Sequence, residues 1–256
     1  MKKRVLVLAG IASFLITAVS QVPAHWVTQR AATLLPVTLQ GVSGTLWQGS
    51  VHSVIWQNVQ LRRVQWDFQV LALLRGKAAV NVQAQWVAGG TLDAICALGV
   101  TGAVQCEQMN LADIPAQSLS PYLQRYQIPP LRGQLQAALT DVAWKQGSIP
   151  QANGTLTWQQ AGITQSPQVF GDYNAILTVD EESGQQLTLS SAPAAALTLD
   201  GSGQWQPDGK YQFALNLQPI PTAVSQLSQG LSWIAGAPRA DGRYHIEKQG
   251  SLPIAR

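Results

Sequence analysis

Val64-Gln65-Trp66-Asp67-Phe68-Gln69-Val70 alternates apolar and polar residues over seven positions. Side chains of a β-strand point to opposite faces in turn, so this spacing predicts a strand with one face buried and the other face in water. The same period of two recurs from Val37 onward, over residues 51–55, 59–61, 80–84, 135–139, 155–158, 176–179, 187–189, 197–199 and 211–217.

The segments between these stretches are too short for helical crossovers, because parallel strands need a connection of a dozen or more residues. The sequence therefore predicts a mainly β fold whose strands pair antiparallel.

Two stretches have helical spacing instead. In residues 113–127, Asp113 stands at a cap position and Leu119, Tyr122, Leu123 and Tyr126 follow at intervals of three and four. Residues 222–234 place Val224, Leu227, Leu231 and Ile234 on one helical face. Each stretch predicts a short amphipathic helix that covers one end of a sheet, with an apolar stripe that belongs to the core or binds a partner.

These helices belong to an internal repeat. Asn110-Leu111-x-x-Ile114-Pro115 recurs as Asn216-Leu217-x-x-Ile220-Pro221. We therefore expect two repeated β-rich units, residues 37–132 and 133–256, each with a short helix near its end.

The N-terminus has the pattern of an export signal. Lys2, Lys3 and Arg4 precede an apolar run that extends over residues 5–22, long enough to span about 27 Å as a helix at about 1.5 Å per residue. We expect a cytoplasmic stub at 1–4, a transmembrane signal-anchor at 5–22, a linker at 23–36 and a periplasmic bulk domain. The alternative is a cleaved signal peptide, cut after Ser20 or after Ala24.

The composition argues against nucleic acid as a partner. Charged residues make up 11% of the chain, and three of the charges behind its net charge of +3 are the membrane-flanking Lys2, Lys3 and Arg4. The exported part is therefore close to neutral, whereas nucleic-acid binders carry a basic patch.

Cys96 and Cys106 are the two cysteines of the chain, and Gly99 and Gly102 lie between them. In an oxidising compartment, cysteines that flank a glycine-containing turn predict a structural disulfide across a hairpin. Their spacing is not that of a C-x-x-C redox pair, and the scattered His25, His52 and His245 supply no zinc ligands nearby. We expect no metal and no cofactor.

No motif predicts an enzyme: the chain has no P-loop, no dinucleotide fingerprint, no H-E-x-x-H and no G-x-S-x-G. Asp180-Glu181-Glu182 is the one acidic cluster, and Ser183-Gly184 after it indicates a solvated hairpin turn. The many tryptophans either fill the core or line an aromatic groove for glycans or lipid tails.

Several short motifs, taken in order, resemble a known family. They are the apolar N-terminal segment, residues 41–49 (Gly-Val-Ser-Gly-Thr-Leu-Trp-Gln-Gly), Val64-Gln65-Trp66, Leu73-Leu74-x-Gly76 and the cysteine pair. Together they resemble the protein N family of the bacterial type II secretion pathway.

This resemblance implies a non-enzymatic accessory component of the inner membrane that faces the periplasm. It would help to export folded proteins across the outer membrane by binding other subunits, among them the inner-membrane platform and the secretin.

The same G-x-L-W-x-G and L-L-x-G motifs also look like segments of AsmA- and TamB-type envelope proteins, whose curved sheets accommodate lipid. This second resemblance implies an alternative function, a periplasmic lipid-binding or lipid-transfer module.

Overall fold

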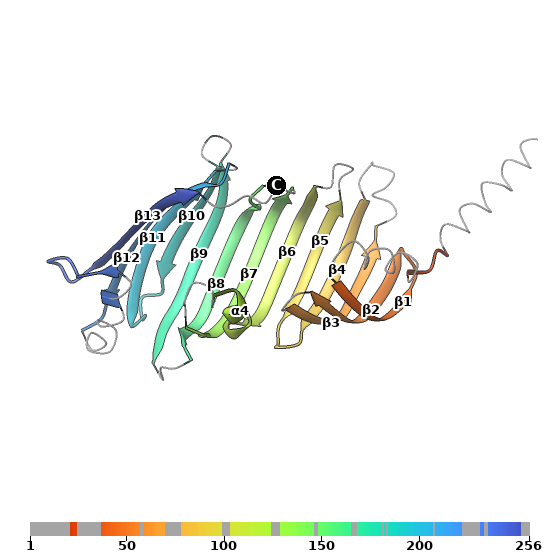
Figure 1. Ribbon diagram of the computed structural model, residues 1–256, viewed down its shortest axis with the longest axis horizontal. Coiled ribbons are helices and arrows are strands. Elements are labelled where there is room, and N and C mark those ends of the chain that lie inside the picture. Colours follow the sequence, from red (N-terminus) through yellow and green to blue (C-terminus); the bar gives the residue numbers. More distant parts are fainter. Residues whose placement is uncertain are drawn as a thin grey trace, which may run out of the picture. The chain divides into compact units, whose positions relative to one another are not determined.

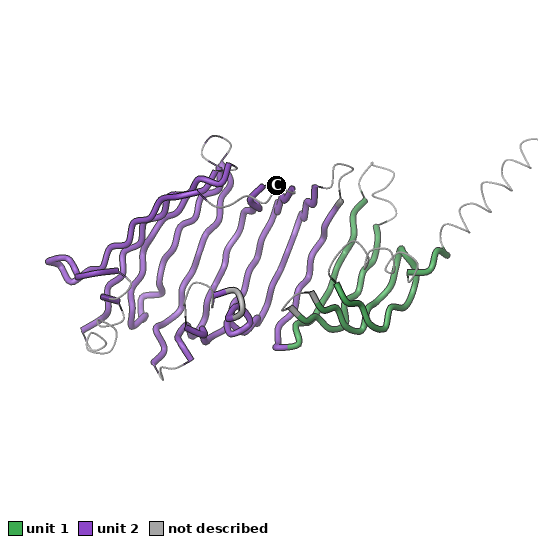
Figure 2. Tube along the Cα trace, viewed as in Figure 1, with its two compact units in different colours: residues 1–87 green, residues 88–256 purple. Residues whose placement is uncertain are grey.

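The architecture is described from a computed structural model of the chain. The structure describes residues 21–24, 37–56, 59–69, 78–98, 103–123, 129–145, 148–164, 168–180, 182, 184–206, 208–221, 231–232 and 235–251. Its contacts divide the chain into unit 1, Met1–Val87, and unit 2, Ala88–Arg256 (Figure 2).

Unit 1 holds four described strands, β1 Val37–Gly44, β2 Gln48–Trp56, β3 Val59–Phe68 and β4 Ala78–Trp86 (Figure 1). Each pairs antiparallel with the next along the chain. Val51, Val64, Trp66 and Val82 come together on one face through the pairs Val51↔Val64 and Trp66↔Val82. Val51 is buried there, so the alternation in residues 64–68 packs one face of this sheet as predicted, and Val70 lies outside the described residues.

Unit 2 holds nine described strands that also follow chain order and pair antiparallel. They are β5 Thr91–Leu98, β6 Val104–Pro115, β7 Leu131–Trp144, β8 Gln151–Ile163, β9 Val169–Asp180, β10 Gly184–Ser191, β11 Leu197–Trp205, β12 Lys210–Pro219 and β13 Tyr244–Ser251. The predicted mainly β, antiparallel architecture is confirmed.

Gln185 is the most deeply buried large side chain among the described residues, with 1% of its surface exposed. Its amide reaches over β9 to β8, where its Oε1 accepts a hydrogen bond from Ala152 N at 2.7 Å and its Nε2 donates to Ala152 O at 2.8 Å. Nε2 also donates to Thr178 O at 3.1 Å. The side-chain amide thus bonds to Ala152 as the backbone of a neighbouring strand would, and it satisfies the backbone N–H and C=O of this residue at the start of β8.

The predicted helix at residues 113–127 differs from the structure at its start. Residues 113–115 still belong to β6, because the ladder to β7 continues through Ile114↔Leu135 and Pro115↔Gln134. Asp113 has a φ of 54° beside a register shift and accepts a hydrogen bond from Gln136 Nε2 at 3.2 Å, so it sits in a β-bulge and caps no helix.

The helix itself begins after Pro115, which is the N-cap residue and makes no side-chain cap hydrogen bond. A 3₁₀ turn, η1 Ala116–Leu119, leads into a single α-helical turn, α4 Ser120–Leu123, and residues 124–128 lie outside the described part. The second predicted helix lies largely outside it as well, and within residues 222–234 only Leu231 and Ser232 are described, both helical.

Most of the predicted membrane anchor, residues 1–20, also lies outside the described part. Among the residues that are described, no helix has both the length and the apolar character needed to cross a membrane. The proposed repeat boundary after Arg132 falls inside β7, and the repeat stays a prediction.

Replacing Gln185 by leucine (Gln185→Leu) removes both hydrogen bonds to Ala152 and leaves a buried N–H and C=O without partners. We expect the free energy of unfolding to fall by about 3 kcal/mol, measured by urea denaturation. The matched control is Gln212→Leu, at an exposed glutamine, where the change is within about 0.5 kcal/mol. Equal effects of the two substitutions would show that Gln185 does not hold the sheet.

Candidate interaction surface

One face of the unit 2 sheet is apolar from its first described strand to its last. A row of register partners, one from each of the nine strands, contains only apolar residues and glycine: Leu92, Leu111, Ala137, Leu156, Ala175, Leu189, Gly201, Leu215 and Ile246. The adjacent row also consists of apolar residues and glycine, except for Lys248 on β13. Its members are Ala94, Met109, Leu139, Gly154, Leu177, Leu187, Gly203, Phe213 and Lys248. We call these two rows the apolar face.

Two described segments outside the strands pack against the unit 2 sheet. At β7, η1 contacts the sheet and Ala116 is fully buried. At β11–β13, Leu231 packs against Leu217 and Tyr244, and Leu215 and Ile246 border this cluster.

Between these two places the apolar face is only half-buried. Leu156, Leu177, Leu187 and Leu189 all have intermediate exposure, whereas a closed sandwich buries such residues under a second sheet. Among the described elements, contacts between strands run along the sheet and no second sheet is stacked on it. A continuous, partly exposed apolar surface of this kind is typical of a binding site for a protein partner, a membrane or an apolar ligand.

Two tryptophans tie together segments that are neighbours in the sheet. Trp66 Nε1 donates to Leu46 O at 3.0 Å in unit 1, and Trp158 Nε1 donates to Arg132 O at 2.9 Å in unit 2. Glycine at position 133 makes the second contact feasible, because a Cβ there would collide with Gln159 O and the Trp158 indole, and its φ is 107°. These two indoles therefore favour the core interpretation of the tryptophans over an aromatic groove.

Trp158 also packs against Tyr173, with 6.0 Å between ring centroids. The Tyr173 hydroxyl donates to Leu197 O at 2.8 Å, and burial raises the pKa of this phenol above its usual range. The phenol therefore stays a hydrogen-bond donor over the whole pH range in which proteins work.

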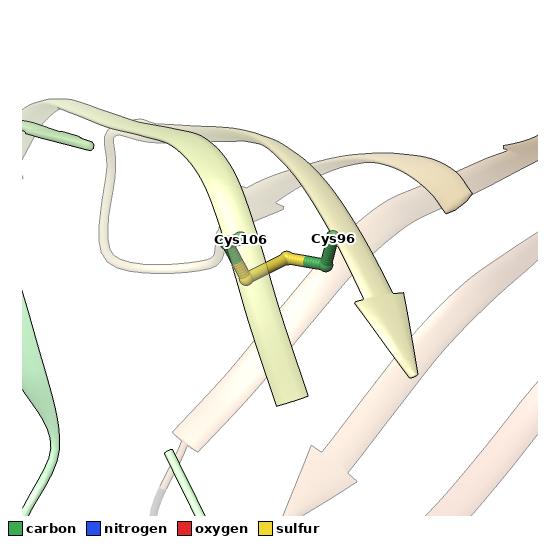
Figure 3. Close-up of a disulfide and its surroundings, with 2 residues drawn as sticks. All are labelled: Cys96 and Cys106. Atoms are coloured by element: carbon green, nitrogen blue, oxygen red, sulfur yellow. A yellow bond between two sulfur atoms is a disulfide. The ribbon is translucent and has the colours of Figure 1, made fainter. Parts of the chain in front are cut away.

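Cys96 on β5 and Cys106 on β6 are register partners and are joined by a disulfide (Figure 3). Cys106 is 3% exposed. The bond closes the hairpin at the first described strands of unit 2.

The other residues singled out from the sequence do not converge on a site. Asp180 ends β9 and its Oδ1 accepts a hydrogen bond from Glu182 N at 2.9 Å, so Asp180 and Glu182 lie at the turn between β9 and β10, while Glu181 lies outside the described residues. His52 lies on β2, His245 on β13, and His25 lies outside the described residues. Within the described ranges, no group of three or more His, Cys, Asp or Glu side chains is placed to hold a metal ion.

Comparison with known proteins gives a consistent result. A family model described as "Type II secretion system (T2SS), protein N" matches residues 36–247. Two curated relatives named "Type II secretion system protein N" are similar over nearly the whole chain. The one from Vibrio cholerae is 28% identical over 243 residues, covering 91% of this chain and 94% of the relative. The one from Aeromonas hydrophila is 29% identical over 260 residues, covering 98% and 100%.

A third curated relative with the same name, from Klebsiella pneumoniae, is 27% identical over 219 residues and covers 77% of this chain and 79% of its own length. No solved structure matches the chain.

Removing the disulfide by the double substitution Cys96→Ala and Cys106→Ala is expected to lower the free energy of unfolding by about 2–3 kcal/mol, because the open hairpin gains entropy in the unfolded chain. Urea denaturation with and without dithiothreitol measures this change. The wild type should lose the same amount when reduced, and the double variant should not respond to the reductant. A wild-type chain indifferent to reduction would contradict the prediction.

Proposed function

The chain belongs to the type II secretion system protein N family, and we propose that it is a non-enzymatic accessory component that works by binding other subunits through its apolar face. The observation that carries this proposal is the half-buried middle of that face, over β8–β10. A surface of leucine and alanine offers packing area and no reactive groups, which suits a binding role.

We further propose that residues 5–22 anchor the chain in the inner membrane and that units 1 and 2 lie in the periplasm. The Lys2-Lys3-Arg4 stub before an apolar run supports this orientation. The disulfide between Cys96 and Cys106 also supports it, because such bonds persist in the oxidising periplasm and are rare in the cytosol. The partners in this proposal are subunits of the inner-membrane platform and the secretin.

Leu177 and Ile176 offer a sharp test because they are sequence neighbours on opposite faces of β9. Leu177 pairs with Leu187 on the apolar face, and Ile176 pairs with Thr188 on the other face, where it is 49% exposed. A photo-crosslinking amino acid at position 177 should give covalent adducts with secretion subunits in living cells, identified by mass spectrometry. The same group at position 176 should give few or none. Equal yields from both positions would rule out the apolar face as the contact surface.

A charge on the apolar face should impair secretion. Leu187→Asp places a carboxylate in the proposed interface, and we expect secretion to fall about tenfold or more, because an unpaired buried charge costs more than the ~1.4 kcal/mol that corresponds to a tenfold change in affinity. Thr188→Asp adds the same charge to the opposite face and should leave secretion unchanged. Thermal unfolding of both variants checks that each is folded.

A second candidate function is lipid binding. The same apolar face favours it, because its two rows extend across all nine described strands of unit 2 and can hold an extended alkyl chain. Native mass spectrometry of the full chain, extracted in mild detergent, should then show bound phospholipid that Leu187→Asp removes and Thr188→Asp keeps. A wild-type spectrum without bound phospholipid would rule out lipid binding. If position 177 also gives crosslinks to secretion subunits, subunit binding is the role of the apolar face.

A further inference from the structure

Four glutamines form a continuous row of register partners on the face of the unit 2 sheet opposite the apolar face. Gln186 pairs with Gln204, Gln204 with Gln212 and Gln212 with Gln249, across β10, β11, β12 and β13. Direct register partners lie on the same face of a sheet, and neighbouring strands are about 4.8 Å apart. The row therefore presents one side-chain amide per strand, at a regular spacing, along a line perpendicular to the strands.

Two shallow hollows lie over this row. One, of about 380 Å³, is lined in part by Gln186, Gln204 and Gln212. The other, of about 440 Å³, is lined in part by Gln204, Gln212 and Gln249. Because Gln204 and Gln212 line both, the hollows adjoin and follow the row from β10 to the outer strand β13. Each has the volume of a small-ligand site.

The hollows carry no net charge. Lys210 is the one charged residue among the described residues that line them, and its Nζ forms an ion pair with Asp208 Oδ2 at 2.8 Å. Thr188 and Ser202, which are register partners, add hydroxyl groups beside the glutamines. The glutamine, serine and threonine side chains therefore supply groups that both donate and accept hydrogen bonds, and Leu187, Gly203, Phe213 and Ala214 complete the lining of the first hollow.

This chemistry selects an uncharged polar ligand. Each glutamine amide has two N–H donors and a carbonyl with two lone pairs, so it can bond to a neighbour and to a ligand at the same time. Removing an amide from water costs far less free energy than removing a charged group, provided that the amide keeps its hydrogen bonds. The exposed face of a sheet is commonly kept soluble by charges, and here neutral amides occupy the row itself, with Lys210 and Glu247 beside it on the same face.

We propose that the glutamine row binds an extended β-linked glycan that lies across β10–β13, with successive sugars over successive strands. A β-1,4-linked chain is straight, and the length of one pyranose in it is comparable with the spacing between strands, so its hydroxyl and acetamido groups meet one amide after another. An α-1,4-linked chain is curved and does not place successive sugars over successive strands in this way. This proposal does not depend on the role in secretion proposed above.

The test uses the full chain in detergent and chitopentaose, five β-1,4-linked N-acetylglucosamine units, as the probe. Isothermal titration calorimetry should detect saturable binding to the wild type. The double variant Gln204→Ala and Gln212→Ala should bind more weakly, with a dissociation constant at least tenfold higher, and its thermal unfolding midpoint should be unchanged.

Unit 1 supplies a matched control. Gln65 and Gln83 are also register partners and line a hollow of about 400 Å³, but this hollow contains the carboxylate of Asp67 and the amide row is two residues long. The double variant Gln65→Ala and Gln83→Ala should bind chitopentaose as the wild type does. Maltopentaose, the α-1,4-linked probe, should bind the wild type at least tenfold more weakly than chitopentaose.

Three results would each overturn the proposal. They are no saturable binding of chitopentaose to the wild type, an equal loss in the two double variants, and equal affinities for chitopentaose and maltopentaose. Secretion is also measured in the Gln204→Ala and Gln212→Ala variant. This measurement shows whether the glutamine row acts independently of the apolar face, whose role the Leu187→Asp variant tests.

Discussion

The backbone ladder of unit 2 is the constraint on which the other features depend. Its register brings one apolar residue or glycine from each of nine strands into a single row, from Leu92 to Ile246. A slip by one residue at any strand would turn that strand's apolar side chains to the opposite face. Several contacts hold the register: the Gln185 amide joins β10 to β8, the disulfide joins β5 to β6, and the Trp158 indole joins β8 to β7.

A single sheet has two faces, and this one uses them for different chemistry. Leu177 and Leu187 lie on a face that the described elements leave half-buried, while Gln204 and Gln212 lie on the face turned the other way. Hydrophobic burial would normally close the first face with a second layer. Because that layer is absent among the described elements, the apolar surface remains available, and the binding role that we propose depends on this availability.

Sequence reasoning succeeded where the signal was local. The alternation in residues 64–68 and 211–217 marks strands β3 and β12, and the two cysteines around a glycine-containing turn mark the β5–β6 hairpin. It was wrong at Asp113, where a capping residue before a helical pattern predicted a helix start. There the pairing of Ile114 with Leu135 extends β6, and Asp113 takes up a bulge. Long-range ladder pairing outweighed a local cap preference, which is worth only about 1 kcal/mol.

The sequence by itself determined the mainly β class, the antiparallel pairing, the disulfide hairpin and the resemblance to the secretion family, because each depends on residues close together along the chain or on motifs in a fixed order. Only the tertiary structure decided which residues share a row. Gln186 and Gln249 stand in one line although 63 positions separate them, as the register connects them through Gln204 and Gln212. The same is true of the apolar face, since a period of two shows that a strand has an apolar side, whereas strand pairing decides that all the apolar sides coincide.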